Sequence, residues 1–137
     1  MNRATQYIAN LFDVSGKTVA LTGGGGILCG TMARALGKAG ARVAVLDNRM
    51  DGAREVADDI VRDGGTAVPI MADALSRGSL ERAHEETVAA LGPVDALVNG
   101  VGGNRKDATT SDEVSFFDIP EEGIRKVFDA NFMSAFF

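Results

Sequence analysis

Several residue types are scarce in this chain of 137 residues, and each scarcity excludes a class of protein. The one cysteine, Cys29, rules out an internal disulfide and favours a reducing cytoplasm. The one histidine, His84, lies in a charged helical segment and predicts a solvated surface residue, so no metal site is expected. No apolar run approaches the roughly 18 residues of a membrane span, and the first residues lack the apolar core of a signal peptide. We therefore expect a cytoplasmic protein without a membrane partner.

Basic residues are also too few for a protein that binds nucleic acid. The chain has 14 Lys and Arg against 19 Asp and Glu, for a formal net charge of -5. Nucleic-acid binding depends on clustered Lys and Arg that neutralise phosphates, so we expect no such partner. With 45% hydrophobic and 24% charged residues, the composition predicts one globular domain over residues 1–137.

Glycine, in contrast, is concentrated where an apolar run changes into a helical pattern. Residues 22–30 read Thr-Gly-Gly-Gly-Gly-Ile-Leu-Cys-Gly and follow the apolar residues 19–21. A strand that turns through glycines into a helix forms an anion cradle, because the backbone can approach closely and the helix N-terminus favours phosphate. The spacing matches neither G-x-G-x-x-G nor a Walker A loop, so the surrounding pattern must support the assignment.

Four apolar runs alternate with helical patterns, which predicts a parallel sheet with right-handed crossovers. The expected strands are residues 18–21, 43–46, 67–72 and 94–99, and the expected helices are residues 27–38, 50–62, 80–91 and 121–137. Pro69 fits the outer place of the third strand in the order 3-2-1-4, because proline removes a ladder donor. The predicted fold is α/β, a Rossmann-type doubly wound parallel sheet in three α/β/α layers.

The two ends of the chain carry apolar residues outside these strands. Phe12 and Val14 are expected to pack on the edge of the sheet, and residues 104–120 are expected to form an inserted loop near the ligand-binding edge. The last predicted helix runs to residue 137 without a cap and carries an apolar stripe of Phe128, Phe132, Phe136 and Phe137. We therefore expect a fold incomplete at the C-terminus, and a homo-oligomer formed through this helix.

Asp47 follows the second apolar run, where open α/β sheets bind a nucleotide ribose. A carboxylate at this place accepts hydrogen bonds from ribose hydroxyls and repels a 2′-phosphate, which favours NAD over NADP. Asp47 is alternatively an ordinary turn aspartate before Asn48. Arg49 would accommodate a phosphate, so NADP stays open.

Together these residues resemble the short-chain dehydrogenases/reductases over residues 15–137. The family's motifs occur in its order: Thr22-Gly23 with the following glycines, Asp47, Ala72-Asp73, Asn99-Gly100-Val101-Gly102 and Asn131. The glycine turn, the segment 99–104 and the insertion before Asn131 are most similar to the D-mannonate oxidoreductase-like (fructuronate reductase-like) branch.

The resemblance implies a role for each of these positions, with NAD as the cofactor and NADP as the alternative. The pyrophosphate would be held by Thr22, Gly23, Gly24, Gly25, Gly26, Ile27 and Leu28. The remaining cofactor-binding residues would be Asp47 at the ribose, Ala72 and Asp73 at the adenine, and Asn99, Gly100, Val101 and Gly102 at the end of the central sheet. Asn131 would be the catalytic residue that anchors a water of the proton relay.

The sequence departs from the family pattern in three places. The family turn has a glycine at the position of Ile27 or Cys29, whereas the glycine here is Gly30, and the Cβ of Cys29 would crowd the helix packing or the pyrophosphate. Gly100 replaces the second asparagine of Asn-Asn-Ala-Gly. The catalytic Tyr-x-x-x-Lys, which the family uses as acid or base, is absent, because the one tyrosine is Tyr7 and Leu11 stands four residues on.

The expected function is therefore that of a cofactor-binding part. We expect an NAD(P)-dependent short-chain oxidoreductase that transfers hydride to or from a small polar hydroxy or oxo substrate, such as a sugar acid. The chain by itself is expected to be inactive. Two alternatives stay open: a non-catalytic dinucleotide-binding or regulatory module, and an S-adenosylmethionine-dependent methyltransferase.

Overall fold

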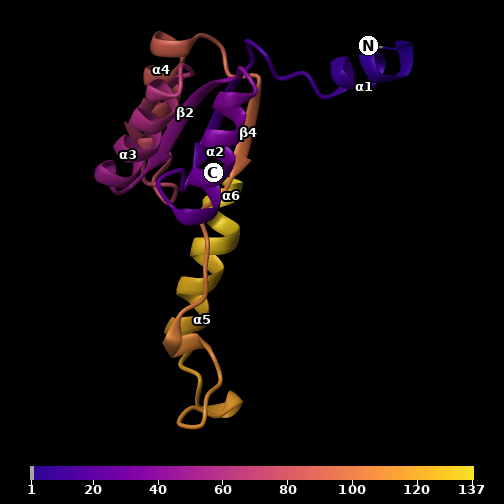
Figure 1. The fold of residues 1–137 in the computed structure, drawn as a ribbon. Helices are drawn as coiled ribbons and strands as arrows, with labels where there is room; N and C mark the ends of the chain where they lie inside the picture. Colours follow the sequence, from indigo (N-terminus) through magenta and orange to yellow (C-terminus); the bar gives the residue numbers. More distant parts are fainter. Residues whose placement is uncertain (1) are drawn as a thin grey trace.

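A computed structural model describes residues 2–137 and contains a four-stranded parallel sheet in the order β3-β2-β1-β4 (Figure 1). The strands are β1 (Thr18–Thr22), β2 (Arg42–Asp47), β3 (Thr66–Met71) and β4 (Ala96–Asn99). The connecting helices are α2 (Ile27–Lys38), α3 (Met50–Arg62) and α4 (Arg77–Leu91). This order confirms the predicted doubly wound sheet, with small shifts at the element ends.

Alternate residues of the central strands are buried on opposite faces of the sheet. On one face, Leu21 of β1 and Val45 of β2 belong to a cluster with Ala33 of α2 and Ile60 of α3. On the other face, a second cluster joins strand residues to α4; it contains Ala20, Ala44, Leu46, Ile70, Ala72, Ala83 and Leu91. Because successive strand side chains point to opposite faces, the continuous apolar runs of β1 and β2 supply both interfaces. The predicted three α/β/α layers are confirmed.

The edge strand β3 carries Pro69, which lies in register with Val45 of β2. Proline has no N–H to donate, and an edge strand needs donors on one side only. The outer place predicted for this strand from its proline is confirmed.

The N-terminal segment differs from the expectation. Residues Arg3–Leu11 form a helix, α1, whose N-cap Asn2 accepts a hydrogen bond from the Thr5 N–H. No residue of α1 is buried, and Figure 1 shows this helix apart from the sheet. Val14 packs against the core as predicted, but Phe12 is 73% exposed. The predicted packing of Phe12 was wrong because α1 leads the chain away from the sheet.

Small residues form the buried face of α2. Cys29, Gly30, Ala33 and Gly37 are its buried positions, and a Cβ on Gly37 would lie 2.5 Å from Ile60 Cγ2 of α3. Of the larger residues at four-residue spacing on this helix, Leu28 and Met32 are exposed, whereas Leu36 is half-buried and packs against the core. Small side chains on the inner face allow α2 to approach both the sheet and α3.

The predicted helix over residues 121–137 is interrupted. It consists of α5 (Glu121–Phe128), a π-helical turn η3 (Asp129–Met133) and α6 (Ser134–Phe136). The preceding residues 104–120 contain two short 3-10 turns, η1 (Lys106–Ala108) and η2 (Phe116–Asp118). Figure 1 shows α5 and this loop projecting from the sheet.

Two structural features are absent from residues 2–137. None of the helices described is both long and apolar enough to cross a membrane. Within the same residues, no group of three or more His, Cys, Asp or Glu side chains is placed to hold a metal ion.

The core can be tested at Leu21, whose exposed fraction is 0%. We expect Leu21→Ala to lower the free energy of unfolding by about 2–5 kcal/mol, because it removes buried methyl groups and leaves a cavity. Leu28→Ala is the matched control, since Leu28 is 75% exposed, and its effect should stay within about 0.5 kcal/mol. Urea denaturation measures both, and equal losses would contradict this description of the core.

Candidate functional site

The glycine turn between β1 and α2 is packed closely by neighbouring backbone. Gly23 has a φ of 65°, and a Cβ there would lie 2.9 Å from the Gly100 carbonyl oxygen. A Cβ on Gly24 would lie 2.7 Å from Val45 Cγ1, and one on Gly25 would collide with the backbone of α3 near its start. Only glycine fits these three positions. The residues that follow, Ile27 and Leu28, are exposed at the start of α2.

Some N–H groups of the turn donate hydrogen bonds within the protein, and others have no side-chain cap. Those of Gly24, Gly25 and Gly26 donate to the Leu46 carbonyl, the Asp47 carboxylate and the Gly23 carbonyl. The N-cap of α2 is Gly26, which provides no side-chain cap. Within the described chain, the N–H groups of Ile27 and Leu28 in the first turn of α2 therefore have no side-chain cap, as phosphate binding requires.

Asp47 ends β2 and faces this turn, as its position in the sequence predicts. Its side chain is only 6% exposed. Its Oδ2 accepts from the Gly25 N–H at 3.0 Å, and its Oδ1 accepts from the Arg49 N–H at 2.8 Å. The Arg49 Nε lies 3.8 Å from Oδ1. A buried carboxylate requires such partners, and two backbone donors and one cation provide them.

A hollow of about 510 Å³ adjoins Asp47 at the N-terminus of α3. It is lined by Gly25, Arg49, Met50, Asp51, Gly52 and Glu55. Two of these residues, Gly25 and Arg49, donate hydrogen bonds to Asp47, which is not itself a lining residue. Sequence reasoning did not single out Met50, Asp51, Gly52 or Glu55, since nothing in their spacing indicates that α3 begins against the glycine turn.

The end of β3 joins the same region through main-chain bonds. The Ala72 N–H donates to the Asp47 carbonyl at 3.0 Å. The Asp73 N–H donates to Ser79 Oγ at 3.0 Å, and Asp73 Oδ1 accepts from the Leu75 N–H at 2.9 Å. These contacts place Ala72 at the carboxyl end of β2 and join the Asp73 side chain to the backbone of its own turn.

The end of β4 contacts the turn through Gly100 and explains how Cys29 is accommodated. Asn99 is in register with Thr22, and Thr22 Oγ1 accepts from the Gly100 N–H at 3.1 Å. The Cys29 side chain is buried, and its sulfur occupies the space that a Cβ on Gly100 would need. The thiol therefore points toward Gly100, the residue after β4. Two departures from the family pattern, Cys29 and Gly100, compensate each other.

Asn131 lies in the π-helical turn and binds the backbone that follows β4. Its Oδ1 accepts from the Gly103 N–H at 3.0 Å, and its Nδ2 donates to the Gly103 carbonyl at 2.9 Å and to the Val127 carbonyl at 2.8 Å. A Cβ on Gly102 would lie 2.5 Å from Asn131 Oδ1. The amide group thus joins the last helix to Gly102 and Gly103, next to the predicted cofactor residue Val101.

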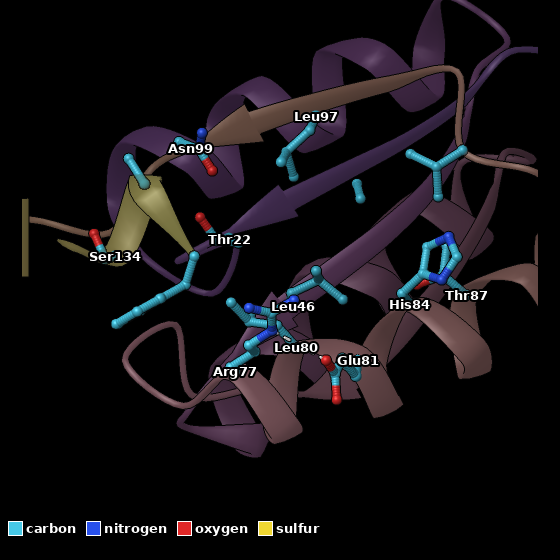
Figure 2. Close-up of a pocket in the computed structure, with 14 residues that line it drawn as sticks. Thr22, Leu46, Arg77, Leu80, Glu81, His84, Thr87, Leu97, Asn99 and Ser134 are labelled. Atoms are coloured by element: carbon cyan, nitrogen blue, oxygen red, sulfur yellow. Dashed lines mark hydrogen bonds and ion pairs between the residues drawn. The ribbon is translucent and has the colours of Figure 1, made fainter. Parts of the chain in front are cut away.

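A separate cavity of about 340 Å³ lies between the sheet and α4, and its lining is mostly apolar (Figure 2). Leu46 and Leu97 line it from the strands, and His84 lines it from α4. Of the predicted site residues, Thr22 and Asn99 border it. His84 is exposed on α4, as its charged neighbours predict.

The loop of residues 104–120 packs on the start of α5. A Cβ on Gly123 would lie 2.8 Å from the Asp107 carbonyl oxygen, so η1 and α5 are in close contact. Arg105 Nε donates to Asp107 Oδ1 at 2.9 Å, and this guanidinium lowers the pKa of the Asp107 carboxyl below its ordinary value of 3.8. Phe116 and Phe117, at η2, are both exposed.

Comparison with known proteins agrees with this fold. Residues 17–137 match the family described as short chain dehydrogenase, and the chain belongs to that family. An uncharacterised oxidoreductase of Bacillus subtilis, UxuB, is 44% identical over 132 residues, which are 90% of this chain and 48% of UxuB. The 7alpha-hydroxysteroid dehydrogenase of Escherichia coli is 32% identical over 90% of this chain and 45% of its own length.

A solved structure extends the comparison to a bound cofactor. A proposed D-mannonate oxidoreductase from Haemophilus influenza, solved with bound NAD, superposes with a TM-score of 0.87 at 31% identity. The match covers 94% of this chain and 50% of that chain. The expected resemblance to the D-mannonate oxidoreductase-like branch is confirmed. The chain spans about half the length of these relatives.

The contact between Cys29 and Gly100 can be tested by a double-mutant cycle. We expect Gly100→Ala to destabilise the protein by about 1–3 kcal/mol, because the new methyl group meets the Cys29 sulfur and the Thr22 carbonyl. In a Cys29→Ala background the same change should cost less by about 1 kcal/mol, since the sulfur is gone. Urea denaturation of the four proteins gives the coupling, and additive effects would contradict the contact.

Proposed function

We propose that this chain is the cofactor-binding part of an NAD(H)-dependent short-chain oxidoreductase. The supporting observation is the glycine turn, where three glycines leave a bare backbone cradle and the N–H groups of Ile27 and Leu28 lack a side-chain cap. Dinucleotide pyrophosphate is the anion that such a cradle accepts at the carboxyl ends of a doubly wound sheet. The bound NAD described for the Haemophilus influenza relative is consistent with this ligand.

NAD is proposed over NADP on grounds of charge. A 2′-phosphate would have to approach the buried Asp47 carboxylate, and the adjoining hollow adds the acidic side chains of Asp51 and Glu55. Arg49 is the cation on this side, and its Nε already lies 3.8 Å from Asp47 Oδ1. Hydroxyl donors of an unmodified ribose suit this acceptor-rich corner better than a phosphate does.

The proposed reaction is hydride transfer between nicotinamide and a small polar hydroxy or oxo compound, such as a sugar acid. When bound, the nicotinamide ring supplies the hydride donor or acceptor. The substrate class is supported by the printed description of the Haemophilus influenza relative as a proposed D-mannonate oxidoreductase. Asn131, joined to Gly103, is the proposed catalytic-site residue of this chain.

The 137 residues are proposed to bind the cofactor without turning over substrate. The acid–base pair of the family, Tyr-x-x-x-Lys, does not occur in this sequence. Without a group to move the proton of the hydroxyl, hydride transfer lacks its acid–base partner. A dinucleotide-binding or regulatory module would bind the cofactor in the same way, so binding alone does not separate the two functions. Substrate turnover, measured after the chain is joined to a catalytic half, would support the oxidoreductase.

Calorimetric titration tests the cofactor. We expect NADH to bind, NADPH to bind about tenfold more weakly, a difference of about 1.4 kcal/mol, and S-adenosylmethionine not to bind. The physical reason is the position of the Asp47 carboxylate beside the ribose corner. Binding of S-adenosylmethionine without NADH would instead support a methyltransferase and overturn the proposal.

We also propose that the last helix mediates self-association. Phe128, Phe132 and Phe136 are exposed along one side of α5, η3 and α6, with ring centroids 4.8 Å and 6.3 Å apart in sequence order. An apolar patch of this kind is stabilised when a second surface covers it. A second copy of the chain is the proposed partner.

Sedimentation velocity tests this interface. We expect the wild-type chain to associate and Phe132→Ser to shift it toward monomer, because the central ring of the stack is lost. Phe117→Ser is the control, since Phe117 is the same residue type and even more exposed than Phe132, but lies in the loop of residues 104–120. If the two variants sediment alike, the phenylalanine stripe is not the interface.

A further inference from the structure

Asp47, at the end of β2, is hydrogen-bonded to three separate backbone segments. Both oxygens of its carboxylate already accept hydrogen bonds from backbone: Oδ2 from Gly25, at 3.0 Å, and Oδ1 from Arg49, at 2.8 Å. Its own carbonyl accepts from the Ala72 N–H at 3.0 Å. One residue therefore joins the glycine turn, the start of α3 and the end of β3.

The glycine turn is the element that most needs such a connection. Glycine has the widest conformational freedom of any residue, so a run of four glycines loses much entropy when it takes one shape. Gly24 and Gly26 are held by main-chain bonds to Leu46 and Gly23. Gly25, between them, donates its N–H to the Asp47 carboxylate, and this bond to a charged acceptor is of the stronger kind.

Packing on the other side of Gly25 acts together with this bond. A Cβ on Gly52 would lie 3.0 Å from the Gly25 carbonyl oxygen, and one on Gly25 would lie 2.7 Å from the Gly52 carbonyl carbon. The backbones of the turn and of α3 are thus in direct contact. Asp47 holds both partners of this contact, because Arg49, at the N-cap of α3, donates to its second oxygen.

We propose that Asp47 is a positioning residue for the phosphate cradle. Its carboxylate holds Gly25 against α3 in the unliganded protein, and so keeps the N–H groups of Ile27 and Leu28 directed at the place of the phosphate. This inference rests on the proposed cofactor, and it adds a role that is separate from contact with the adenosine ribose. A cradle that has its binding conformation before the phosphate arrives binds the phosphate more tightly, because less conformational entropy is lost on binding.

Two variants of equal charge test the inference. Asp47→Asn and Asp47→Ala both remove the negative charge, but only asparagine keeps a side-chain oxygen able to accept from Gly25. Any difference between them therefore reports the hydrogen bond and not the loss of charge. Asp73→Ala is the control, because it removes the other predicted adenosine contact, and no hydrogen bond joins the Asp73 side chain to the turn among the described residues.

The first measurement is hydrogen exchange at residues 22–28 without any ligand. We expect exchange to be slowest in the wild type, faster in Asp47→Asn, and about tenfold faster than wild type in Asp47→Ala, because local opening of the turn becomes easier. Asp73→Ala should exchange as the wild type does. If Asp47→Ala unfolds the chain, Asp47→Leu replaces it in the comparison with Asp47→Asn, because leucine is close to asparagine in size, has no charge and cannot accept a hydrogen bond.

The second measurement is binding of nicotinamide mononucleotide, which has a phosphate but no adenosine ribose, with NADH titrated in parallel. We expect Asp47→Ala to bind the mononucleotide about threefold more weakly than Asp47→Asn does, since only the shape of the cradle differs. Equal mononucleotide binding and unchanged exchange, with only NADH weakened, would overturn the inference and leave the proposed function standing. If the wild type binds neither nucleotide, the proposed function fails, and the exchange rates alone decide whether Asp47 positions the turn.

Discussion

Contact between backbone segments without intervening side chains is the constraint on which the candidate site depends. At the carboxyl ends of β1, β2 and β4, a Cβ on Gly23 would meet Gly100, and a Cβ on Gly25 would meet Gly52. These contacts bring the turn, the start of α3 and the end of β4 into one small region. They also require that polar main-chain groups find partners nearby, and the buried Asp47 carboxylate provides one of them.

Much of this fold could be predicted from the sequence because buried strands leave a clear pattern. The continuous apolar runs of β1 and β2 indicate burial on two faces, and Pro69 indicates an edge. The separation of α1 from the sheet could not be predicted, since an apolar helical pattern does not state which surface covers it. The π-helical turn at Asn131 also leaves no residue pattern, because it is a one-residue shift in hydrogen bonding.

The sequence predicts which positions belong to the candidate site, but it predicts few of the contacts between them. Residue type and place near the ends of the strands indicate Thr22, Asp47 and Asp73, and the family resemblance indicates Asn131. Partners far apart in the sequence were not predictable. The fit of the Cys29 sulfur beside Gly100 depends on the distance between α2 and the end of β4. The Gly25 N–H donates to Asp47 only when the turn has its folded conformation. The predicted roles of these residues in binding and catalysis stay predictions.

The proline in β3 has a consequence for how the sheet can grow. Proline on an edge strand interrupts the row of donors that another strand would use, which protects that edge from unwanted pairing. At the opposite edge, the residues Ala96–Asn99 of β4 contain no proline and are largely exposed. The two edges of the sheet therefore differ, and we expect a further strand to pair along β4 (Ala96–Asn99), the edge without a proline.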